Sequence, residues 1–264
     1  MKALVKIGGT LIDSPDSRNR LASELAGAAR AGVELVVVHG GGKQMTRFLG
    51  ERGIESRFIN GLRVTTPEAM DAVLKVLAGS VNQELVAAFV AAGAMAVGLS
   101  GIDAALVEAE PMDPALGAVG RPVRANPWLL ELLASHAYVP VVACVAGDRA
   151  GNMYNVNADQ MAAICAAAFK ADRVVFLTDV AGVLRDGRVL PCLSAADCEG
   201  LIKDGVATGG MHAKLSAAIS ALRGGVREIV IAPGAEPGVV GRALEGKKVG
   251  THLVLEAQEN GKKS

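Results

Sequence analysis

Three charged residues lie at sequence positions where an ordinary solvent-exposed charge is not expected. Lys6 lies within the apolar run 3–7, Lys214 follows the glycine pair 209–210, and Asp159 begins an alanine-rich stretch. A buried lysine is costly without a nearby anion, and lysines beside phosphates offset the charge that moves during phosphoryl transfer. The three residues are candidates for a catalytic group in which Asp159 holds the lysines. The alternative for Lys6 is an edge position whose ammonium reaches water.

Two glycine-rich turns follow apolar runs. Gly8-Gly9 comes directly after the run that contains Lys6, and Gly40-Gly41-Gly42 follows His39. Such turns let backbone N–H groups approach phosphates, although either turn alone fits a tight connection between a strand and a helix equally well. Neither turn matches the P-loop pattern or the dinucleotide-binding pattern. The pair therefore indicates phosphate binding of another kind.

Two polar segments could bind a small acid. Arg63 lies in Asn-Gly-Leu-Arg-Val-Thr, and an arginine can hold a carboxylate through two parallel hydrogen bonds. A single loop arginine is more often a solvated charge. Asn155, Asn157 and Asp159 alternate at the start of the alanine-rich stretch. At least one should cap a helix there, and three exceed what a cap needs.

The elements that must position these residues alternate between strands and helices. Strands are predicted at 3–7, 35–39, 94–99, 139–145, 173–177 and 228–232. Helices are predicted at 18–31, 43–52, 67–92, 127–135, 158–169, 195–204 and 211–224. This order predicts a mostly parallel sheet covered on both faces, with ligands at the carboxyl ends of the strands. Segment 108–126 is expected to form a hairpin flap, 147–154 an irregular stretch, and 258–264 a frayed polar tail.

The amino-acid composition argues against several classes of binding partner. Lysine plus arginine and aspartate plus glutamate are equal at 27 each, and no basic block points to nucleic acid. No apolar run approaches the ~20 residues of a membrane span, so we expect no membrane and a cytoplasmic protein. The four cysteines lack C-x-x-C spacing and the four histidines are scattered, so no metal site is predicted.

Five motifs together resemble the amino acid kinase family. They are residues 6–9, 39–42, 60–65, 155–159 and 209–214. The resemblance runs from residue 6 to about 253, and the motif at 60–65 is most similar to members that phosphorylate N-acetyl-L-glutamate. It implies a three-layer αβα sandwich with a mostly parallel central sheet. Residues 1–170 would form a lobe for the acyl amino acid and for dimerisation, and residues 171–264 an ATP-binding lobe.

The resemblance also implies roles for single residues. Lys6 and Lys214 match two lysines that stabilise the transition state, and Asp159 matches the carboxylate that positions them. Residues matching the substrate site are Gly41, Gly42, Arg63 and Asn155. Residues matching the ATP site are Gly9, Asp179, Val180, Ala181, Gly182, Val183, Leu184, Val206, Ala207, Thr208 and Gly210. ATP would be used with Mg²⁺ held mainly through the phosphates.

Two positions depart from the family pattern. Ile102 stands where many relatives carry lysine, and Ala213 stands where many have proline. Arginine-inhibited hexameric members carry an extra N-terminal helix. Because this chain begins at its first strand, we expect a homodimer without arginine feedback.

Two other functions remain compatible with the sequence. One is a kinase for another acylated or carrier-linked acidic amino acid, such as N-succinylglutamate or aminoadipate. The neutral net charge lacks the strong basic patch that an acidic carrier protein would favour. The other is a non-catalytic regulator that binds nucleotide or amino acid. The presence of both lysines with Asp159 argues against that role.

Overall fold

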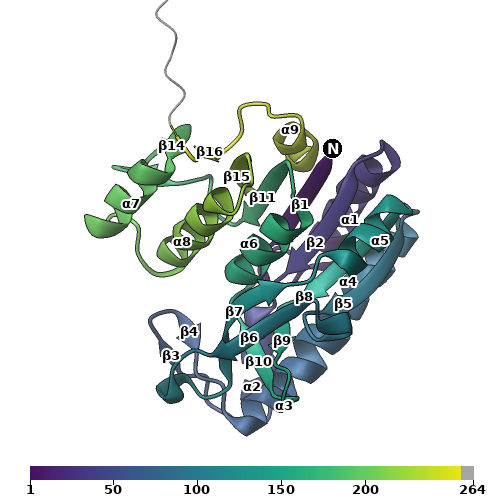
Figure 1. Ribbon diagram of the computed structural model, residues 1–264, viewed down its shortest axis with the longest axis vertical. Coiled ribbons are helices and arrows are strands. Elements are labelled where there is room, and N and C mark those ends of the chain that lie inside the picture. Colours follow the sequence, from purple (N-terminus) through teal and green to yellow (C-terminus); the bar gives the residue numbers. More distant parts are fainter. Residues whose placement is uncertain (257–264) are drawn as a thin grey trace, which may run out of the picture.

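The protein is described by a computed structural model that covers residues 1–256 (Figure 1). The tail 258–264, expected to be frayed, lies outside the described residues. An eight-stranded sheet forms the centre. Its strands, in spatial order, are β14 (Cys192–Ser194), β16 (Thr251–Val254), β15 (Glu228–Pro233), β11 (Arg173–Thr178), β1 (Lys2–Ile7), β2 (Glu34–His39), β8 (Tyr138–Ala143) and β5 (Met95–Ser100).

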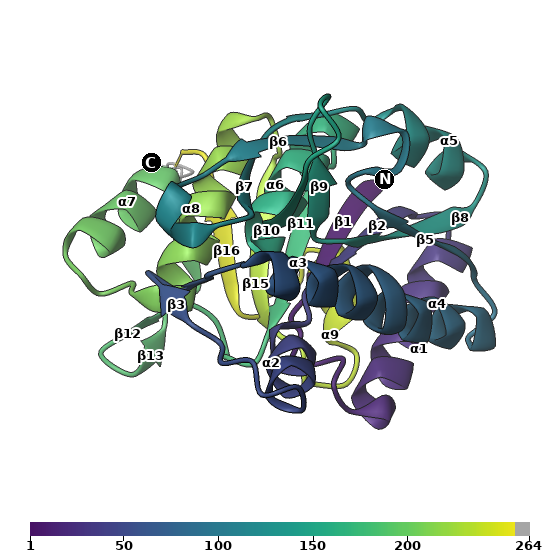
Figure 2. The same cartoon turned by 90° about the horizontal axis from the view of Figure 1, so that it is seen from below.

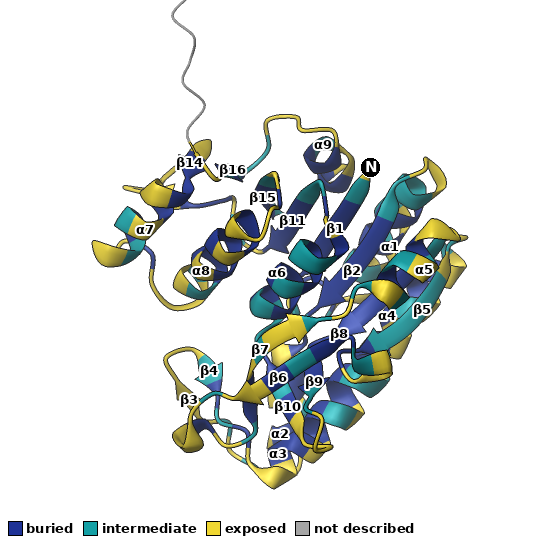
Figure 3. Cartoon of the chain, viewed as in Figure 1, coloured by how far each residue is buried: buried dark blue, intermediate teal, exposed yellow. Residues whose placement is uncertain are grey.

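The sheet is mostly parallel, as predicted. From β15 to β5 all neighbours run parallel, whereas β16 is antiparallel to β15 and β14 is parallel to β16. The strands β1, β2 and β11 are nearly continuous runs of buried aliphatic residues (Figure 3). Such runs are typical of a parallel sheet covered on both faces. The short strands β14 and β16 were not predicted, because each is only three or four residues long.

Helices cover both faces and complete the three-layer αβα arrangement (Figure 2). One face carries α1 (Pro15–Arg30), α2 (Gly42–Gly50), α9 (Val239–Leu244) and the long helix described below; the other carries α5 (Trp128–Ser135), α6 (Ala158–Phe169), α7 (Ala195–Lys203) and α8 (Gly209–Arg223). The predicted helices are confirmed within a few residues at each end. Helix α9 was missed because only six residues separate two glycine-containing turns.

The long helix runs without interruption from Pro67 to Ala91. It consists of α3 (Pro67–Val73), the π-helical segment η1 (Leu74–Val81) and α4 (Asn82–Ala91). It passes as a membrane span by length and composition only, because charged residues such as Lys75 and Glu84 interrupt its apolar runs. In the structure α4 packs against α1 and β5, and Leu85 and Phe89 are fully buried. This packing is that of a helix in the protein core.

A small closed barrel stands beside the sheet. It contains β6 (Val107–Pro111), β7 (Val119–Ala125), β9 (Val145–Gly147) and β10 (Met153–Val156). The antiparallel pair β6–β7 confirms the predicted hairpin flap. The short turn η3 (Pro114–Leu116) connects its two strands, and the short turn η2 (Asp103–Ala105) precedes β6. The single strand predicted at 139–145 is two strands, because the chain leaves the sheet at Cys144 and enters the barrel.

Two small hairpins project from the body. One pairs β3 (Phe58–Ile59) with β4 (Leu62–Arg63), and the other pairs β12 (Leu184–Arg185) with β13 (Arg188–Val189). Asn60 and Gly61 connect the first hairpin with φ values of 51° and 79°. Positive φ at both central residues defines the two-residue turn that Asn-Gly favours. This turn places Phe58 directly opposite Arg63.

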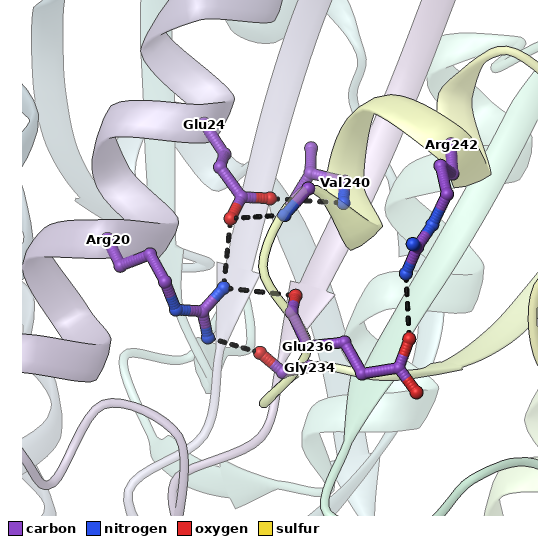
Figure 4. Close-up of polar contacts among 7 residues, drawn as sticks. Arg20, Glu24, Gly234, Glu236, Val240 and Arg242 are labelled. Atoms are coloured by element: carbon purple, nitrogen blue, oxygen red, sulfur yellow. Dashed lines mark hydrogen bonds and ion pairs between the residues drawn. The ribbon is translucent and has the colours of Figure 1, made fainter.

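The segments before and after the predicted boundary near residue 170 are in direct contact. Strand β1 pairs with β11 along its length. On the far side, Arg20 and Glu24 of α1 reach the segment around α9 (Figure 4). Arg20 donates to the carbonyl oxygens of Gly234 and Glu236, and Glu24 accepts from the N–H groups of Gly238 and Val240. The two-lobe division stays a prediction.

Candidate active site

Lys6, Asp159 and Lys214 meet in a buried cluster. Lys6 Nζ lies 2.8 Å from Asp159 Oδ1, and Lys214 Nζ lies 3.0 Å from Oδ1 and 3.1 Å from Oδ2. Each of the three residues is 7% exposed. Strand β1 lies in the middle of the sheet, between β11 and β2, so the alternative of an edge position for Lys6 was wrong. The structure thus brings together all three predicted catalytic residues.

Local structure explains how Asp159 comes to face the lysines. Asn157 is the N-cap of α6, where its side-chain oxygen accepts from the N–H groups of Asp159 and Gln160. Asp159 is therefore free of capping and points into the cluster. Asn155, two residues before Asn157, donates to Thr65 Oγ1. The three alternating polar residues thus divide into one cap and two side chains available for a site.

Opposing effects set the charge state of the cluster. Burial alone would raise the pKa of Asp159, but Lys6 and Lys214 outweigh it, and the pKa lies below its usual value. Burial and the neighbouring Lys6 charge lower the pKa of Lys214 to about 8, although Asp159 opposes this. Two ammonium groups therefore share one carboxylate, which leaves an excess of positive charge. Such a site favours a further anion.

The two glycine turns pack directly against each other beside the cluster. A Cβ atom on Gly9 would lie 2.8 Å from the Gly41 nitrogen and 3.0 Å from the Gly42 nitrogen. A Cβ on Gly40 would lie 3.3 Å from the Gly9 nitrogen. Because these neighbours are backbone atoms, only glycine allows the approach. The turns form one surface of backbone amides at the carboxyl ends of β1 and β2.

A pocket of about 180 Å³ adjoins this surface. Its lining includes all four residues predicted to bind the substrate: Gly41, Gly42, Arg63 and Asn155. Arg63 Nη2 donates to Gly42 O at 3.0 Å and to Thr46 Oγ1 at 2.8 Å, and Nη1 donates to Ser56 Oγ. Burial lowers the pKa of Arg63 from its ordinary value. The guanidinium is thus held in place at the pocket wall.

Two pocket residues were missed by the sequence analysis. The Arg63 guanidinium lies 4.7 Å from the centre of the Phe58 ring, and Phe58 also lines the pocket while 55% exposed. An aromatic residue close to an Asn-Gly turn could have marked Phe58 as a candidate pocket residue in the sequence. Cys144 lines the pocket wall at the carboxyl end of β8, where the strand-end rule could have found it. Burial raises the pKa of this thiol to about 11.

The residues predicted to contact ATP lie in two loops, one after β11 and one before α8. Asp179 to Leu184 follow β11, and Val206 to Thr208 precede α8, whose first residues are Gly209 and Gly210. Val183 and Ala207 are buried, whereas Leu184 and Val206 expose apolar side chains. Thr251 Oγ1 accepts from the Val183 N–H and fixes the first loop. These residues do not line the pocket around Arg63.

No metal-binding cluster is present in the described part of the chain, where no three His, Cys, Asp or Glu side chains come close enough to hold an ion. A divalent ion bound through nucleotide phosphates and water needs few protein ligands. The buried ammonium pair and the backbone amides of the two glycine turns fit a bound polyphosphate without such a cluster.

Comparison with known proteins gives concordant matches. The model of the amino acid kinase family matches residues 1–233. Acetylglutamate kinase of Solibacter usitatus (strain Ellin6076) is 64% identical over 255 residues, which cover 96% of this chain and 99% of the relative. Acetylglutamate kinase of Roseobacter denitrificans (strain ATCC 33942 / OCh 114) is 44% identical over 235 residues, covering 89% and 82%.

Among solved structures, N-acetylglutamate synthase from Neisseria gonorrhoeae, complexed with coenzyme A and N-acetyl-glutamate, superimposes with a TM-score of 0.86 and 25% identity. The match covers 97% of this chain and 60% of the synthase chain, so this chain spans less than two thirds of that protein.

Proposed function

Because this chain belongs to the amino acid kinase family, we propose that it transfers the γ-phosphoryl group of ATP to the side-chain carboxylate of N-acetyl-L-glutamate. The products are N-acetyl-L-glutamyl 5-phosphate and ADP, in a cytoplasmic step of arginine biosynthesis. The observation that carries the proposal is 64% identity to an acetylglutamate kinase over nearly the full length of both chains. The pocket beside the Lys6–Asp159–Lys214 cluster agrees with it.

The chemistry needs no general base. A glutamate side chain has a reference pKa near ~4.3 and is ionised at neutral pH. Its oxygen forms a bond to the γ-phosphorus while the bond between that phosphorus and the β–γ bridging oxygen breaks, and the electron pair leaves with ADP. The difficulty is the approach of an anion to a polyanion.

The lysine cluster offsets that repulsion. Lys6, two residues before the first glycine turn, is assigned to the attacking carboxylate and the γ-phosphoryl group. Lys214, one helical turn after Gly210 in α8, is assigned to the bridging oxygen that becomes negative. Asp159 keeps both ammonium groups in place when no substrate is bound. Mg²⁺, when bound through the phosphates, supplies further charge neutralisation.

The pocket supplies orientation. Arg63 is assigned to a carboxylate of the acyl amino acid through parallel hydrogen bonds, and Asn155 with the amides of Gly41 and Gly42 to its remaining polar groups. Gly9 and Gly210 are assigned to phosphate oxygens. Residues 179–184 and 206–208 are assigned to the rest of ATP.

We also propose that the protein is a homodimer. Strand β5 is an edge strand, and exposed apolar residues lie on β5 itself (Met95) and on α4, which packs against it (Val90). Two more, Trp128 and Leu132, lie on α5, which packs against the neighbouring strand β8. An exposed apolar edge is a surface that a second copy could cover. Light scattering coupled to size-exclusion chromatography tests this: a mass of one chain across micromolar concentrations would reject it.

The function is tested by trapping the acyl phosphate with hydroxylamine in the presence of ATP and Mg²⁺. N-acetylglutamate, N-succinylglutamate, free glutamate and N-acetylaminoadipate are compared at equal concentration. Selective hydroxamate formation with N-acetylglutamate is expected. Selective reaction with another substrate would reassign the acyl group, and no product with any of the four would reject the proposal.

A further inference from the structure

His39 is a buried histidine that the proposed reaction does not use directly. It ends β2, immediately before the glycine turn 40–42, and its side chain is fully shielded from solvent. Its Nδ1 atom lies 2.9 Å from the carbonyl oxygen of Gly40, and its Nε2 atom lies 3.0 Å from Asn82 Nδ2. Asn82 Nδ2 also lies 2.9 Å from the carbonyl oxygen of Val141.

These contacts determine which ring nitrogen carries the proton. The Val141 carbonyl can only accept, so the Asn82 group that faces it must be the NH₂. Its second hydrogen then points to His39 Nε2, which must be an acceptor. The proton therefore sits on Nδ1 and is donated to Gly40 O. Burial lowers the pKa of His39 to about 4, which keeps the ring neutral near pH 7.

Asn82 occupies an unusual place for its residue type. It is 1% exposed within the long apolar helix 67–91, where an aliphatic residue would cost less. Strand β5 makes room for it: a Cβ on Gly98 would lie 2.2 Å from Asn82 Oδ1. The π-helical segment just before it places Leu77 against Gly41, where a Cβ would meet Leu77 Cδ2 at 2.3 Å. Gly98 in β5 thus leaves space for the Asn82 side chain, and Leu77 of the helix packs against the glycine turn.

The hydrogen bond to Gly40 O fixes the orientation of the peptide between Gly40 and Gly41. A trans peptide is planar, so the direction of the Gly40 carbonyl fixes the opposite direction of the Gly41 N–H. Within residues 1–256 neither the Gly41 nor the Gly42 N–H has a hydrogen-bond partner. Both nitrogens lie close to Gly9, where the two turns meet. A free glycine peptide would otherwise rotate easily.

We propose that His39, held by Asn82, is a positioning residue that orients the Gly40–Gly41 peptide so that its N–H faces the site of phosphoryl transfer. The inference rests on the proposed function for the identity of the reaction. Its structural part, the Nδ1–H tautomer and the fixed peptide, does not. A donor that is already oriented stabilises charge developing in the transition state more than charge in the ground state.

The first measurement uses the unmodified protein and needs no activity. Nitrogen-15 NMR of histidine-labelled protein should show His39 as the Nδ1–H tautomer, without titration between about pH 6 and 9. A dominant Nε2–H tautomer or a titrating ring would overturn the inference. Either result stands even if no acyl amino acid is phosphorylated, so failure of the proposed function remains distinguishable.

The second measurement compares variants by steady-state kinetics and by the amide shift of Gly41. His39→Leu removes both hydrogen bonds, whereas His39→Gln keeps one donor and one acceptor. We expect His39→Leu to lower kcat about 10-fold or more, which is less than the roughly 100- to 1000-fold cost of removing an oriented donor outright, because the Gly41 N–H is loosened and not removed. The KM for ATP should change less than about threefold, the Gly41 amide should shift, and His39→Gln should recover most of kcat.

The matched control is His252→Leu. His252 lies in β16 and pairs with Glu228 at 2.6 Å, away from the turns. Its loss should lower the melting temperature while leaving kcat and the Gly41 amide unchanged. If His39→Leu is folded but keeps wild-type kcat and an unshifted Gly41 amide, the positioning role is wrong. If it does not fold, Gly98→Ala, which crowds Asn82 from β5, replaces it under the same criteria.

Discussion

Lys214 contacts both carboxylate oxygens of Asp159, at 3.0 and 3.1 Å, and shares Oδ1 with Lys6. One buried carboxylate therefore serves two ammonium groups that come from opposite ends of the chain. Without ligand the cluster carries one positive charge in excess. This imbalance is the physical basis for several of the predictions below.

Replacing either lysine with alanine should lower kcat by at least ~100-fold, because each removes a preorganised charge. Steady-state kinetics with saturating ATP and N-acetylglutamate measure the effect. Lys2→Ala is the matched control, since Lys2 lies on the same strand and contacts Glu131 at the other end of β1. Near-wild-type turnover in both Lys6→Ala and Lys214→Ala would reject the mechanism.

Asp159→Asn should lower stability as well as kcat. Removing one partner of a buried ion pair costs about 3–5 kcal/mol, because the remaining charges are left uncompensated. Urea unfolding measures the free energy of unfolding. Glu131→Gln removes a half-exposed partner of Lys2 and should change it by less than ~1 kcal/mol. Equal losses in the two variants would contradict the central role of Asp159.

Activity should fall as pH rises through about 8. The pKa of Lys214 is lowered to about 8, so the ammonium form is present below that pH and lost above it. The profile of kcat/KM for ATP should show a descending limb there. Because phosphates favour the charged lysine, the limb in kcat should lie at higher pH. Lys214→Arg stays charged and should abolish the limb; an unchanged limb in this variant would exclude Lys214 as its source.

Arg63→Ala should act mainly on the KM for the acyl amino acid. The loss of a charged hydrogen bond is worth about 1.5–3 kcal/mol, roughly a 10- to 150-fold rise in KM. Arg63→Lys should not restore it, because lysine lacks the planar fork. Arg57→Ala, an exposed arginine in the same loop, is the control. An unchanged KM in Arg63→Ala would remove Arg63 from the substrate site.

Gly9→Ala should strongly reduce kcat, because its Cβ would lie within 3.0 Å of backbone atoms of Gly41 and Gly42 and push the two turns apart. Gly27→Ala in α1 meets nothing within 4 Å and should stabilise the protein by up to ~1 kcal/mol with unchanged kinetics. Melting temperature and kcat together separate the two effects. Wild-type turnover in Gly9→Ala would show that close packing of the turns is not needed.

The sequence by itself determined the alternation of strands and helices, because burial on both sides requires continuous aliphatic runs such as 3–7 and 173–177. It also determined the candidate residues, since a lysine within an apolar strand is costly unless an anion lies nearby. It indicated a helix cap among Asn155, Asn157 and Asp159 but not which residue provides it.

Only the tertiary structure decided how these residues meet. Lys6 could have been an edge residue until its strand was found between β11 and β2. The sharing of Asp159, the contact of the two glycine turns and the His39–Asn82 pair all join segments far apart in the chain. Such contacts depend on strand order and crossover direction, which no local pattern encodes. The short strands β14 and β16 were missed for the same reason: pairing with neighbours, rather than their own composition, makes them strands.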